Sequence, residues 1–296
     1  MHMERLRGLL FGAMIGDAYA LPAHWIYDTE KIATGFKNYQ DYLPISNHMF
    51  HNNKPKGSQT HYGDQALLLL RSIASTNGFD LNQYRTHWLT YMSQYQGYID
   101  HATKESLTRL SSGGNTGSSS DDLGGFTMCV PLIVQHFDDD HLFDFLKKAL
   151  KLTHDDETLL LHATFMTKVI LELIIGKPLV KAIYHVAKQD PEYQALLDFT
   201  LRFISEDEVE AIKAIGQSCS CDFATPSALL IILNHPNDFE AAMKINLLAG
   251  GDSAARGMLI GMLLGAEMGI GHLPEHLVAH LQCRDLLNAF TDHKRI

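Results

Sequence analysis

The sequence predicts an all-α protein built from many helices. Apolar side chains recur every three or four residues along most of the 296-residue chain, which is the spacing of one face of a helix. Alternating runs of Val, Ile and Thr between hairpin turns are nearly absent, so few strands are expected. Apolar residues make up 46% of the chain, which is typical of a protein with a buried core and too many for a disordered one.

The periodicity predicts helices over residues 6–20, 65–75, 81–95, 126–137, 142–152, 158–175, 179–187, 195–204, 206–215, 226–233, 238–248, 253–268 and 275–290. Residues 258–266 are apolar on nearly every side, which predicts a central helix covered by others. Helices are expected to begin at the N-caps Asp80, Asp156, Ser205 and Asn237, with Pro274 in a first turn. Helix ends are expected near Gly78, Gly97, Gly176 and Gly216.

Two stretches lack this periodicity. Residues 44–63 are polar and rich in His and Asn, and residues 111–125 read SSGGNTGSSSDDLGG. The composition of the second stretch alone is equally consistent with a flexible linker and with a loop beside a site.

The formal net charge of −10, without a basic cluster, argues against nonspecific nucleic-acid binding, because such binding depends on Lys and Arg. No apolar run approaches the roughly 20 residues that span a bilayer. Glu4 and the pair Gly16-Asp17 interrupt any apolar region of a secretory signal. We therefore expect a cytoplasmic protein that contacts neither membranes nor nucleic acids.

The cysteines fit neither a disulfide framework nor a zinc ribbon; they are Cys129, Cys219, Cys221 and Cys283. We interpret them as small buried thiols, since free cysteine is among the most buried residue types. The sequence Cys219-Ser220-Cys221 leaves a redox pair or half of a metal site as alternatives.

Three segments differ from ordinary core helix. In the first, Gly12 and Gly16 would let another helix approach closely, and Asp17 lies near a helix end. In the second, His61-Tyr62-Gly63-Asp64, Asp64 suits an N-cap. Each feature also has a purely structural explanation as a helix terminus.

The third segment is Gly250-Gly251-Asp252-Ser253, which leads into a helix with glycines at 257, 261 and 265. Two glycines before a capping Asp form a tight backbone at a helix N-terminus, a geometry that favours anions. A simple cap followed by a close-packing glycine face explains the same residues.

Together and in this order, the three segments resemble the ADP-ribosylglycohydrolase family. The run from Ser120 through Asp122 to Pro131 is similar to the family's central loop, and Thr153-His154-Asp155-Asp156 is similar to its short His-containing segment. The resemblance covers about residues 4–275. It implies one domain over residues 1–296, a compact orthogonal multi-helix bundle with a central cleft, and a functional loop rather than a linker at 111–125.

In active members, the resemblance implies two divalent ions, usually magnesium or manganese, held between carboxylate clusters while a glycosidic bond of ADP-ribose is cleaved. Here only Asp64 matches the first cluster and Asp252 the second, because Ala254 and Ala255 replace the other ligands. Two carboxylates cannot balance four positive charges. We therefore expect one magnesium or manganese ion at Asp64 and Asp252, or none. The runs GGDSAARG at 250–257 and PAHW at 22–25 look more like the branch that contains J-type crystallins and selenoprotein J, whose members keep the fold while losing the usual ligands.

The leading hypothesis is a hydrolase that acts on a small-molecule or ADP-ribosylated substrate. The resemblance places the catalytic groups at Asp252, Asp64, His24, Asp122 and His154. It places substrate contacts at Asp17, Ser120, Gly124, Gly125, Gly251 and Ser253. One alternative is an inactive binding or structural protein that retains the fold. Another is a transition-metal site formed by His24, His61 and either Asp64 or Asp252.

Overall fold

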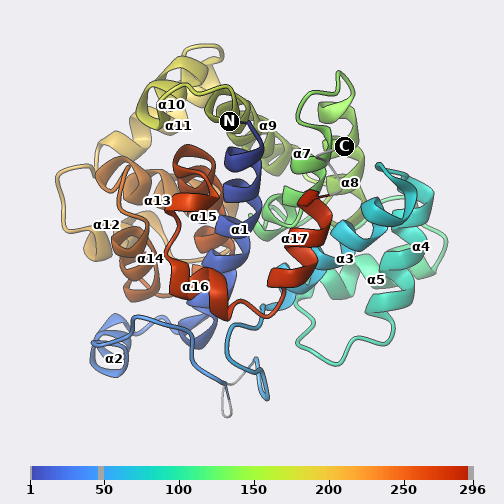
Figure 1. Cartoon of the computed structure of the whole chain (residues 1–296), viewed down its shortest axis with the longest axis horizontal. Helices are drawn as coiled ribbons and strands as arrows, with labels where there is room; N and C mark the ends of the chain where they lie inside the picture. The colour runs from blue at the N-terminus through green and yellow to red at the C-terminus, as the bar shows by residue number, and fades with distance from the viewer. Residues whose placement is uncertain (1, 46–49, 293–296) are drawn as a thin grey trace.

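Two helices from opposite ends of the chain, α1 (His2–Ala20) and α15 (Ser253–Met268), run side by side through the middle of the molecule (Figure 1). The computed structural model describes residues 2–45 and 50–292. Within these residues the regular structure is helical, with isolated bridges in place of strands, which confirms the predicted all-α class.

The remaining elements are η1 (Leu21–Ala23), α2 (Thr29–Gly35), α3 (His61–Thr76), α4 (Leu81–Met92), α5 (His101–Ser111), α6 (Gly124–Thr127), α7 (Val130–His136), α8 (Leu142–Thr153), α9 (Glu157–Ile174), α10 (Leu179–Ala187), α11 (Pro191–Leu201), α12 (Glu208–Ile215), α13 (Cys221–Asn234), α14 (Phe239–Leu248), η2 (Ile270–His272), α16 (Glu275–His280) and α17 (Arg284–Asp292).

Glycines allow α1 and α15 to pack at backbone distance. A Cβ placed on Gly12 would lie 2.0 Å from the carbonyl oxygen of Gly261, and one on Gly16 would lie 2.0 Å from that of Gly257. Gly8 and Gly265 repeat the arrangement one turn further along. The glycine spacings in the two segments are therefore the two halves of one contact, which holds the start of α15 beside the end of α1.

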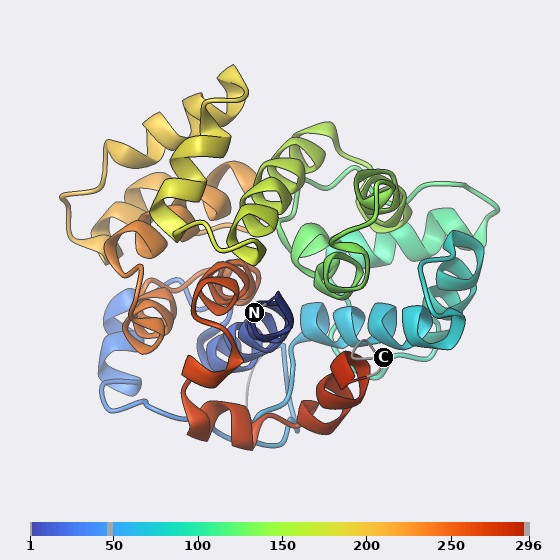
Figure 2. The same cartoon turned by 45° about the horizontal axis from the view of Figure 1, so that its top comes forward.

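The other helices enclose this pair on both sides. Helices α3 and α7 pack on one side with α4, α5 and α8 outside them, while α13 and α14 pack on the other side with α10 to α12 beyond (Figures 1 and 2). Residues 258–266 are all buried, and partial exposure begins at Glu267, which agrees with the predicted central helix. Among the described residues, no helix is both long and apolar enough to cross a bilayer.

The predicted helices over 179–187 and 253–268 have the observed bounds, and most others differ by a few residues at their ends. The predicted helix over 126–137 divides into α6 and α7, and that over 275–290 divides into α16 and α17. Helices α2 and α5 were not predicted, because α2 buries only Ile32 and α5 has polar Thr103 and Ser106 on its buried face.

The N-caps at Asp80 and Asp156 are confirmed, since each side chain accepts a backbone N–H of the first turn. Three other predicted caps were wrong. Thr60 caps α3 in place of Asp64, Asp207 caps α12 in place of Ser205, and Asp238 caps α14 in place of Asn237. Pro274 precedes α16 rather than lying within its first turn. A cap must reach the N2 or N3 amide, and only the observed residues do so.

Candidate active site

Side chains from separate segments meet at the N-terminus of α15. His24 follows η1, Tyr62 lies in the first turn of α3, Asp122 lies in the loop before α6, and Asp252 caps α15. All four are at least 96% buried, because their exposed fractions do not exceed 4%. The chain therefore gathers its most polar core residues at the end of the central helix pair.

Asp122 and Asp252, which we call the acid pair, share one phenol. The Tyr62 hydroxyl lies 2.9 Å from Asp122 Oδ2 and 2.8 Å from Asp252 Oδ2. A phenol has one proton to donate, so it cannot satisfy two ionised carboxylates at once. Burial, and then the charge of Asp252, raise the pKa of Asp122 well above its usual range; burial also raises the pKa of Asp252. The pair therefore favours retention of a proton.

Backbone amides hold each member of the acid pair in place. Asp252 Oδ1 accepts the Ala255 N–H at 3.2 Å as the cap of α15, and Asp122 Oδ1 accepts the Gly124 N–H at 2.7 Å. Ser120 Oγ accepts the Asp122 N–H at 3.2 Å. A side chain at Gly124 would collide with the Tyr62 ring, so this glycine lets the loop pack against the phenol. These contacts make Ser120 and Gly124 supports of the acid pair.

The loop at 111–125 is bonded to its neighbours rather than free. The N–H of Ser118 donates to the carbonyl of Thr153, and the N–H of Leu123 donates to that of Cys219. A side chain at Gly125 would collide with the ring of His154. These bonds fix the loop beside the acid pair, and its functional role stays a prediction.

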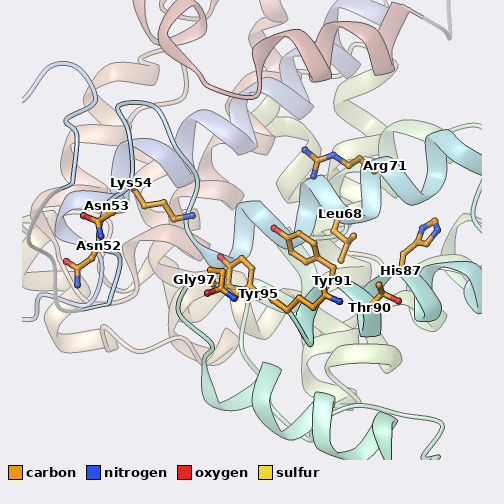
Figure 3. A pocket seen from close by; sticks show the side chains of 12 residues that line it. Asn52, Asn53, Lys54, Leu68, Arg71, His87, Thr90, Tyr91, Tyr95 and Gly97 are labelled. Carbon is orange, nitrogen blue, oxygen red and sulfur yellow. Dashed lines mark hydrogen bonds between the residues drawn. The ribbon is translucent and has the colours of Figure 1, made fainter.

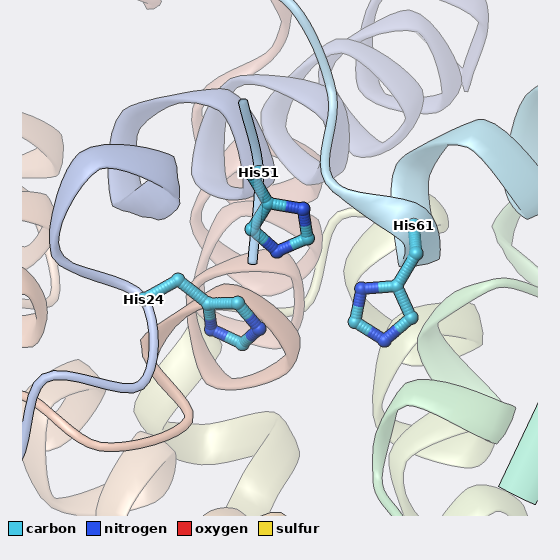
Figure 4. A group of neighbouring side chains, drawn as sticks. All are labelled: His24, His51 and His61. Carbon is cyan, nitrogen blue, oxygen red and sulfur yellow. The ribbon is translucent and has the colours of Figure 1, made fainter. Parts of the chain in front are cut away.

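Three buried histidines, His24, His51 and His61, lie against the acid pair (Figure 4); we call them the histidine cluster. His24 Nδ1 lies 3.6 Å from Asp252 Oδ1, and His61 Nε2 lies 3.0 Å from Asp100 Oδ2. In the contact between His61 and Asp100, burial disfavours both the imidazolium and the carboxylate. The hydrogen bond and the opposite charges outweigh it, so the pKa of His61 is raised and the pKa of Asp100 is lowered.

His154 lies behind the loop, with Nδ1 3.0 Å from Thr153 Oγ1. It is buried, and burial lowers its pKa from 6.5 to about 4, so the ring is neutral at pH 7. It contacts Gly125 rather than a member of the acid pair. Its predicted catalytic role stays a prediction, and the geometry gives it a packing role.

The buried neutral state of His154 predicts a pH-dependent stability. Because its folded pKa is lowered, the unfolded chain binds more protons between pH 6.5 and 4, and stability is lost as pH falls through that interval. A shift from 6.5 to about 4 corresponds to about 3 kcal/mol. A His154→Gln variant should therefore lose about 3 kcal/mol less than the parent when urea unfolding is compared at pH 7 and pH 4.

The difference between variant and parent isolates His154, because Asp17 acts with the opposite sign in both proteins. The pKa of Asp17 is raised to about 6 by burial, so its contribution favours folding at low pH and is lost as pH rises through 6. A His101→Gln variant is the control, because the His101 side chain is 91% exposed. An equal pH dependence in the parent and His154→Gln would contradict the assignment.

Two predicted site residues lie away from the acid pair. Asp17 accepts the backbone N–H and the hydroxyl of Thr60, so it fixes the cap of α3. Asp64 contacts Lys54 Nζ at 2.7 Å and the Tyr95 hydroxyl at 2.6 Å. The first turn of α3 thus directs Tyr62 toward Asp252, and it directs Asp64 toward Lys54. The predicted site roles of Asp17 and Asp64 stay predictions.

The two partners of Asp64, Lys54 and Tyr95, line an open cleft of about 960 Å³ (Figure 3). The cleft lies between the segment at residues 52–54, helix α3 and helix α4, and its lining includes Lys54, Arg71, Tyr91 and Tyr95. Asn52 and Gly97 also line it, and they are chain neighbours of His51 and Tyr98. The cleft therefore approaches the histidine cluster from outside.

The remaining predicted substrate contacts are backbone supports. Gly251 accepts the Trp25 N–H at 2.8 Å and donates to Ile26 at 2.7 Å, and a side chain there would collide with Gln217. Ser253 is fully buried, and its hydroxyl has no hydrogen-bond partner among residues 2–45 and 50–292. Gly251 thus joins three loops around the acid pair.

The two neighbouring cysteines separate in space. Cys219 offers its sulfur beside the acid pair, whereas Cys221 lies with His162 and Asp222. All four cysteines are free thiols, and burial raises the pKa of both Cys219 and Cys221. Cys221 fits the predicted buried thiol, while Cys219 is only partly buried.

A family model described as ADP-ribosylglycohydrolase matches residues 1–295. The chain belongs to the ADP-ribosylglycohydrolase family. Crystallin J1A and Crystallin J1B of Tripedalia cystophora are each 20% identical to it, over 93% and 96% of this chain and 91% and 94% of theirs. A solved structure described as an ADP-ribosylglycohydrolase-related protein complex shares the fold, with a TM-score of 0.70 and 21% identity over 98% of this chain and 96% of that one. The predicted resemblance to the branch that contains the J-type crystallins is confirmed.

The pair of magnesium or manganese ions that the family implies does not fit the side chains of this ADP-ribosylglycohydrolase homologue. The acid pair offers two carboxylates that favour retention of a proton, and Asp64 is already neutralised by Lys54. Magnesium requires several oxygen ligands in near-octahedral geometry. The neighbouring donors are instead the imidazole nitrogens of the histidine cluster and the sulfur of Cys219.

The residues that sequence reasoning misses at this family site are Tyr62, His51 and Asp100. In the sequence Tyr62 stands out only as part of the segment that contains Asp64, whereas Cys219 belongs to the pair for which half of a metal site is an alternative to a buried thiol. Asp100 is the cap of α5, a helix that the periodicity did not predict. A cap assignment at Asp100 would have been the one available signal, because its side chain precedes a helical run at Thr103.

Proposed function

We propose that the chain is a hydrolase that cleaves a glycosidic bond of an ADP-ribose-type substrate, either a small molecule or an ADP-ribosylated group. The observation that carries the proposal is the acid pair, two buried carboxyl groups joined through the Tyr62 hydroxyl. Membership of the ADP-ribosylglycohydrolase family supports the substrate class. A cytoplasmic location is part of the same proposal.

Glycosidic hydrolysis needs a proton donor for the leaving group and a carboxylate that stabilises positive charge at the sugar. Asp122 suits the donor, because burial and the charge of Asp252 raise its pKa well above the usual range. Asp252 suits the carboxylate: burial raises its pKa as well, but the Tyr62 hydroxyl and the Ala255 amide donate to it and act in the opposite direction. Water then attacks the sugar carbon and gives its proton to the ionised Asp122, so the donor is restored and no ion is needed between the two carboxyl groups.

Substrate would reach the acid pair from the cleft, past the histidine cluster and the aromatic rings that pack on it. Since Asp252 is fully buried, side chains on this side must move for substrate to enter. The Lys54 and Arg71 cations and the two tyrosine rings of the cleft suit a pyrophosphate and a base.

One magnesium or manganese ion at Asp64 and Asp252 stays a prediction. The contacts of Asp64 with Lys54 and Tyr95 favour the metal-free alternative. We therefore expect hydrolysis to continue after treatment with a chelator that removes magnesium and manganese.

The second candidate is a structural, crystallin-like role. Two relatives of the chain, Crystallin J1A and Crystallin J1B, carry the crystallin name. Aromatic rings also pack on the side of His24, which lies 3.6 Å from Asp252. Trp25 stacks on His24 with ring centroids 4.2 Å apart, and Phe50 and Tyr98 pack edge-on against Trp25 at 4.9 and 5.0 Å. A closed pocket of this kind favours packing over turnover.

Two measurements separate the candidates. ADP-ribose at a hundredfold excess over its dissociation constant should stabilise the folded chain by about 2.7 kcal/mol, and the thermal midpoint should rise. Release of ADP-ribose from ADP-ribosylated arginine and serine peptides should then be followed by mass spectrometry in the presence of EDTA. An Arg71→Ala variant should reduce the ADP-ribose shift, with Arg202→Ala as a control outside the cleft. A parent that neither shifts nor hydrolyses would favour the crystallin-like role.

A further inference from the structure

The histidine cluster has the arrangement of a metal site, in which His51 joins the two histidines, His24 and His61, of the transition-metal alternative that the sequence leaves open. One ring nitrogen of each of His24, His51 and His61 lies within 4.8 Å of the other two. The exposed fractions of the three residues are 0%, 2% and 0%. The rings surround a common space, and each directs a nitrogen toward its centre (Figure 4). We propose that the histidine cluster binds one divalent transition-metal ion, of which Zn²⁺ is the best match.

The spacing of the rings agrees with three imidazoles on one ion. A Zn–N distance of about 2.0–2.1 Å places each ring centre about 3.2 Å from the ion, so ring centres should be about 5.2 to 5.5 Å apart. The observed separations are 5.4 Å for His24 and His51, 5.6 Å for His51 and His61, and 5.9 Å for His24 and His61. Binding therefore requires only a slight closing of the cluster.

A carboxylate lies beside each of two rings, and that of Asp100 is within hydrogen-bond distance of His61. Asp100 Oδ2 lies 3.0 Å from His61 Nε2, which leaves His61 Nδ1 toward the centre. Among the described residues, His61 Nδ1 has no hydrogen-bond partner. Asp252 Oδ1 lies 3.6 Å from His24 Nδ1, which leaves His24 Nε2 toward the centre. A histidine that ligates a metal through one nitrogen usually gives its other N–H to a carboxylate or carbonyl, and the 3.0 Å contact of His61 with Asp100 has this arrangement.

The chemistry of the donors selects the ion. Imidazole nitrogens suit zinc, copper, nickel and cobalt, whereas magnesium and calcium need oxygen ligands. Three histidines with a remaining coordination position are the ligand set of catalytic zinc sites. The carboxylates of Asp100 and Asp252 supply nearby negative charge to offset the two positive charges of the ion.

The surroundings are built to hold the rings. Trp25 has a φ of 63°, a left-handed conformation that a bulky side chain rarely adopts, and its N–H donates to Gly251 at 2.8 Å. The resulting turn stacks its indole on His24 at a centroid distance of 4.2 Å. A backbone conformation of this kind costs about 1–3 kcal/mol and is kept only where the surrounding contacts hold it, often at ligand sites.

The test uses the full chain, stripped with a chelator and then titrated with Co²⁺ and Zn²⁺. We expect one Co²⁺ per chain with the intense visible bands of a low-coordinate nitrogen site, displacement by one equivalent of Zn²⁺, and no displacement by excess Mg²⁺. His51→Ala and His61→Ala should abolish the bands, and Asp100→Asn should weaken affinity about 10- to 100-fold. His280→Ala is the control, because this half-exposed histidine contacts Asp41 on another surface.

A spectroscopic readout on the parent removes the risk that a variant fails to fold. In ¹⁵N spectra of the histidine rings, Zn²⁺ should coordinate His61 through Nδ1 while Nε2 keeps its proton for Asp100. Failure to load near one equivalent, bands retained in both His51→Ala and His61→Ala, or bands lost in His280→Ala would overturn the proposal. These measurements use metal alone, so they are independent of whether the chain hydrolyses ADP-ribose compounds.

Discussion

A Gly12→Val variant is expected not to fold, because Gly12 has no room for even one additional carbon. Its Cβ would lie 2.0 Å from the carbonyl oxygen of Gly261 and 2.8 Å from the carbonyl carbon, both of which belong to the backbone. Accommodation requires α1 and α15 to separate, which opens the packing of the two most central helices. The expected loss exceeds about 4 kcal/mol, a large fraction of the 5–15 kcal/mol by which such proteins are stable.

The measurement is far-ultraviolet circular dichroism with thermal unfolding of the soluble fraction. Gly35→Ala is the matched control, because Gly35 ends α2 and a Cβ there meets nothing within 4 Å. That variant should stay within about 0.5 kcal/mol of the parent. If Gly12→Val melts near the parent's midpoint, the close contact between α1 and α15 is wrong.

The glycine contact shows how far sequence reasoning reaches in the fold. The four-residue glycine spacing in residues 12–16 and 257–265 predicts two close-packing faces, and the apolar run at 258–266 predicts a central helix. Periodicity within one segment cannot say which partner each face meets. The pairing of Gly12 with Gly261 depends on how more than two hundred intervening residues fold back.

The prediction of helix boundaries has the same limit, because it uses only neighbouring residues in the sequence. Asp64 has the residue type of an N-cap, but Thr60, one turn earlier, has the required backbone conformation and accepts the Tyr62 N–H. This shift of one turn decides which side chains face the acid pair. It turns Tyr62 inward and gives Asp64 to Lys54.

The candidate site was predicted as a set of acidic segments and observed as a mixed one. Asp252, Asp122 and His24 do meet, as the motifs indicated. His51 could not be predicted, because it lies in the non-periodic stretch at 44–63, part of which, residues 46–49, falls outside the described residues. The catalytic roles of Asp122 and Asp252 are tested by the activity of variants.

Asp122→Asn should lower hydrolysis about 10²- to 10⁴-fold while leaving the fold and ADP-ribose binding intact. The amide keeps the shape of the side chain and can still accept the Gly124 N–H, but it cannot deliver a proton. Burial and the charge of Asp252 raise the pKa of Asp122, so the parent's rate should fall as pH rises through that raised value. The alkaline fall should disappear in Asp122→Asn, since the group that titrates is gone.

Asp252→Asn should lower the rate similarly for a different reason, because it removes the negative charge beside the sugar rather than the proton donor. Its residual activity should therefore keep an alkaline fall, which separates the two carboxyl groups by pH profile rather than by rate alone. Asp144→Asn is the matched control, because Asp144 is exposed on α8 and pairs with Lys148. Parental rates in both variants of the acid pair would exclude it as the hydrolytic centre. Normal ADP-ribose binding without turnover in the parent would instead leave a nucleotide-binding protein whose buried acid pair serves the fold.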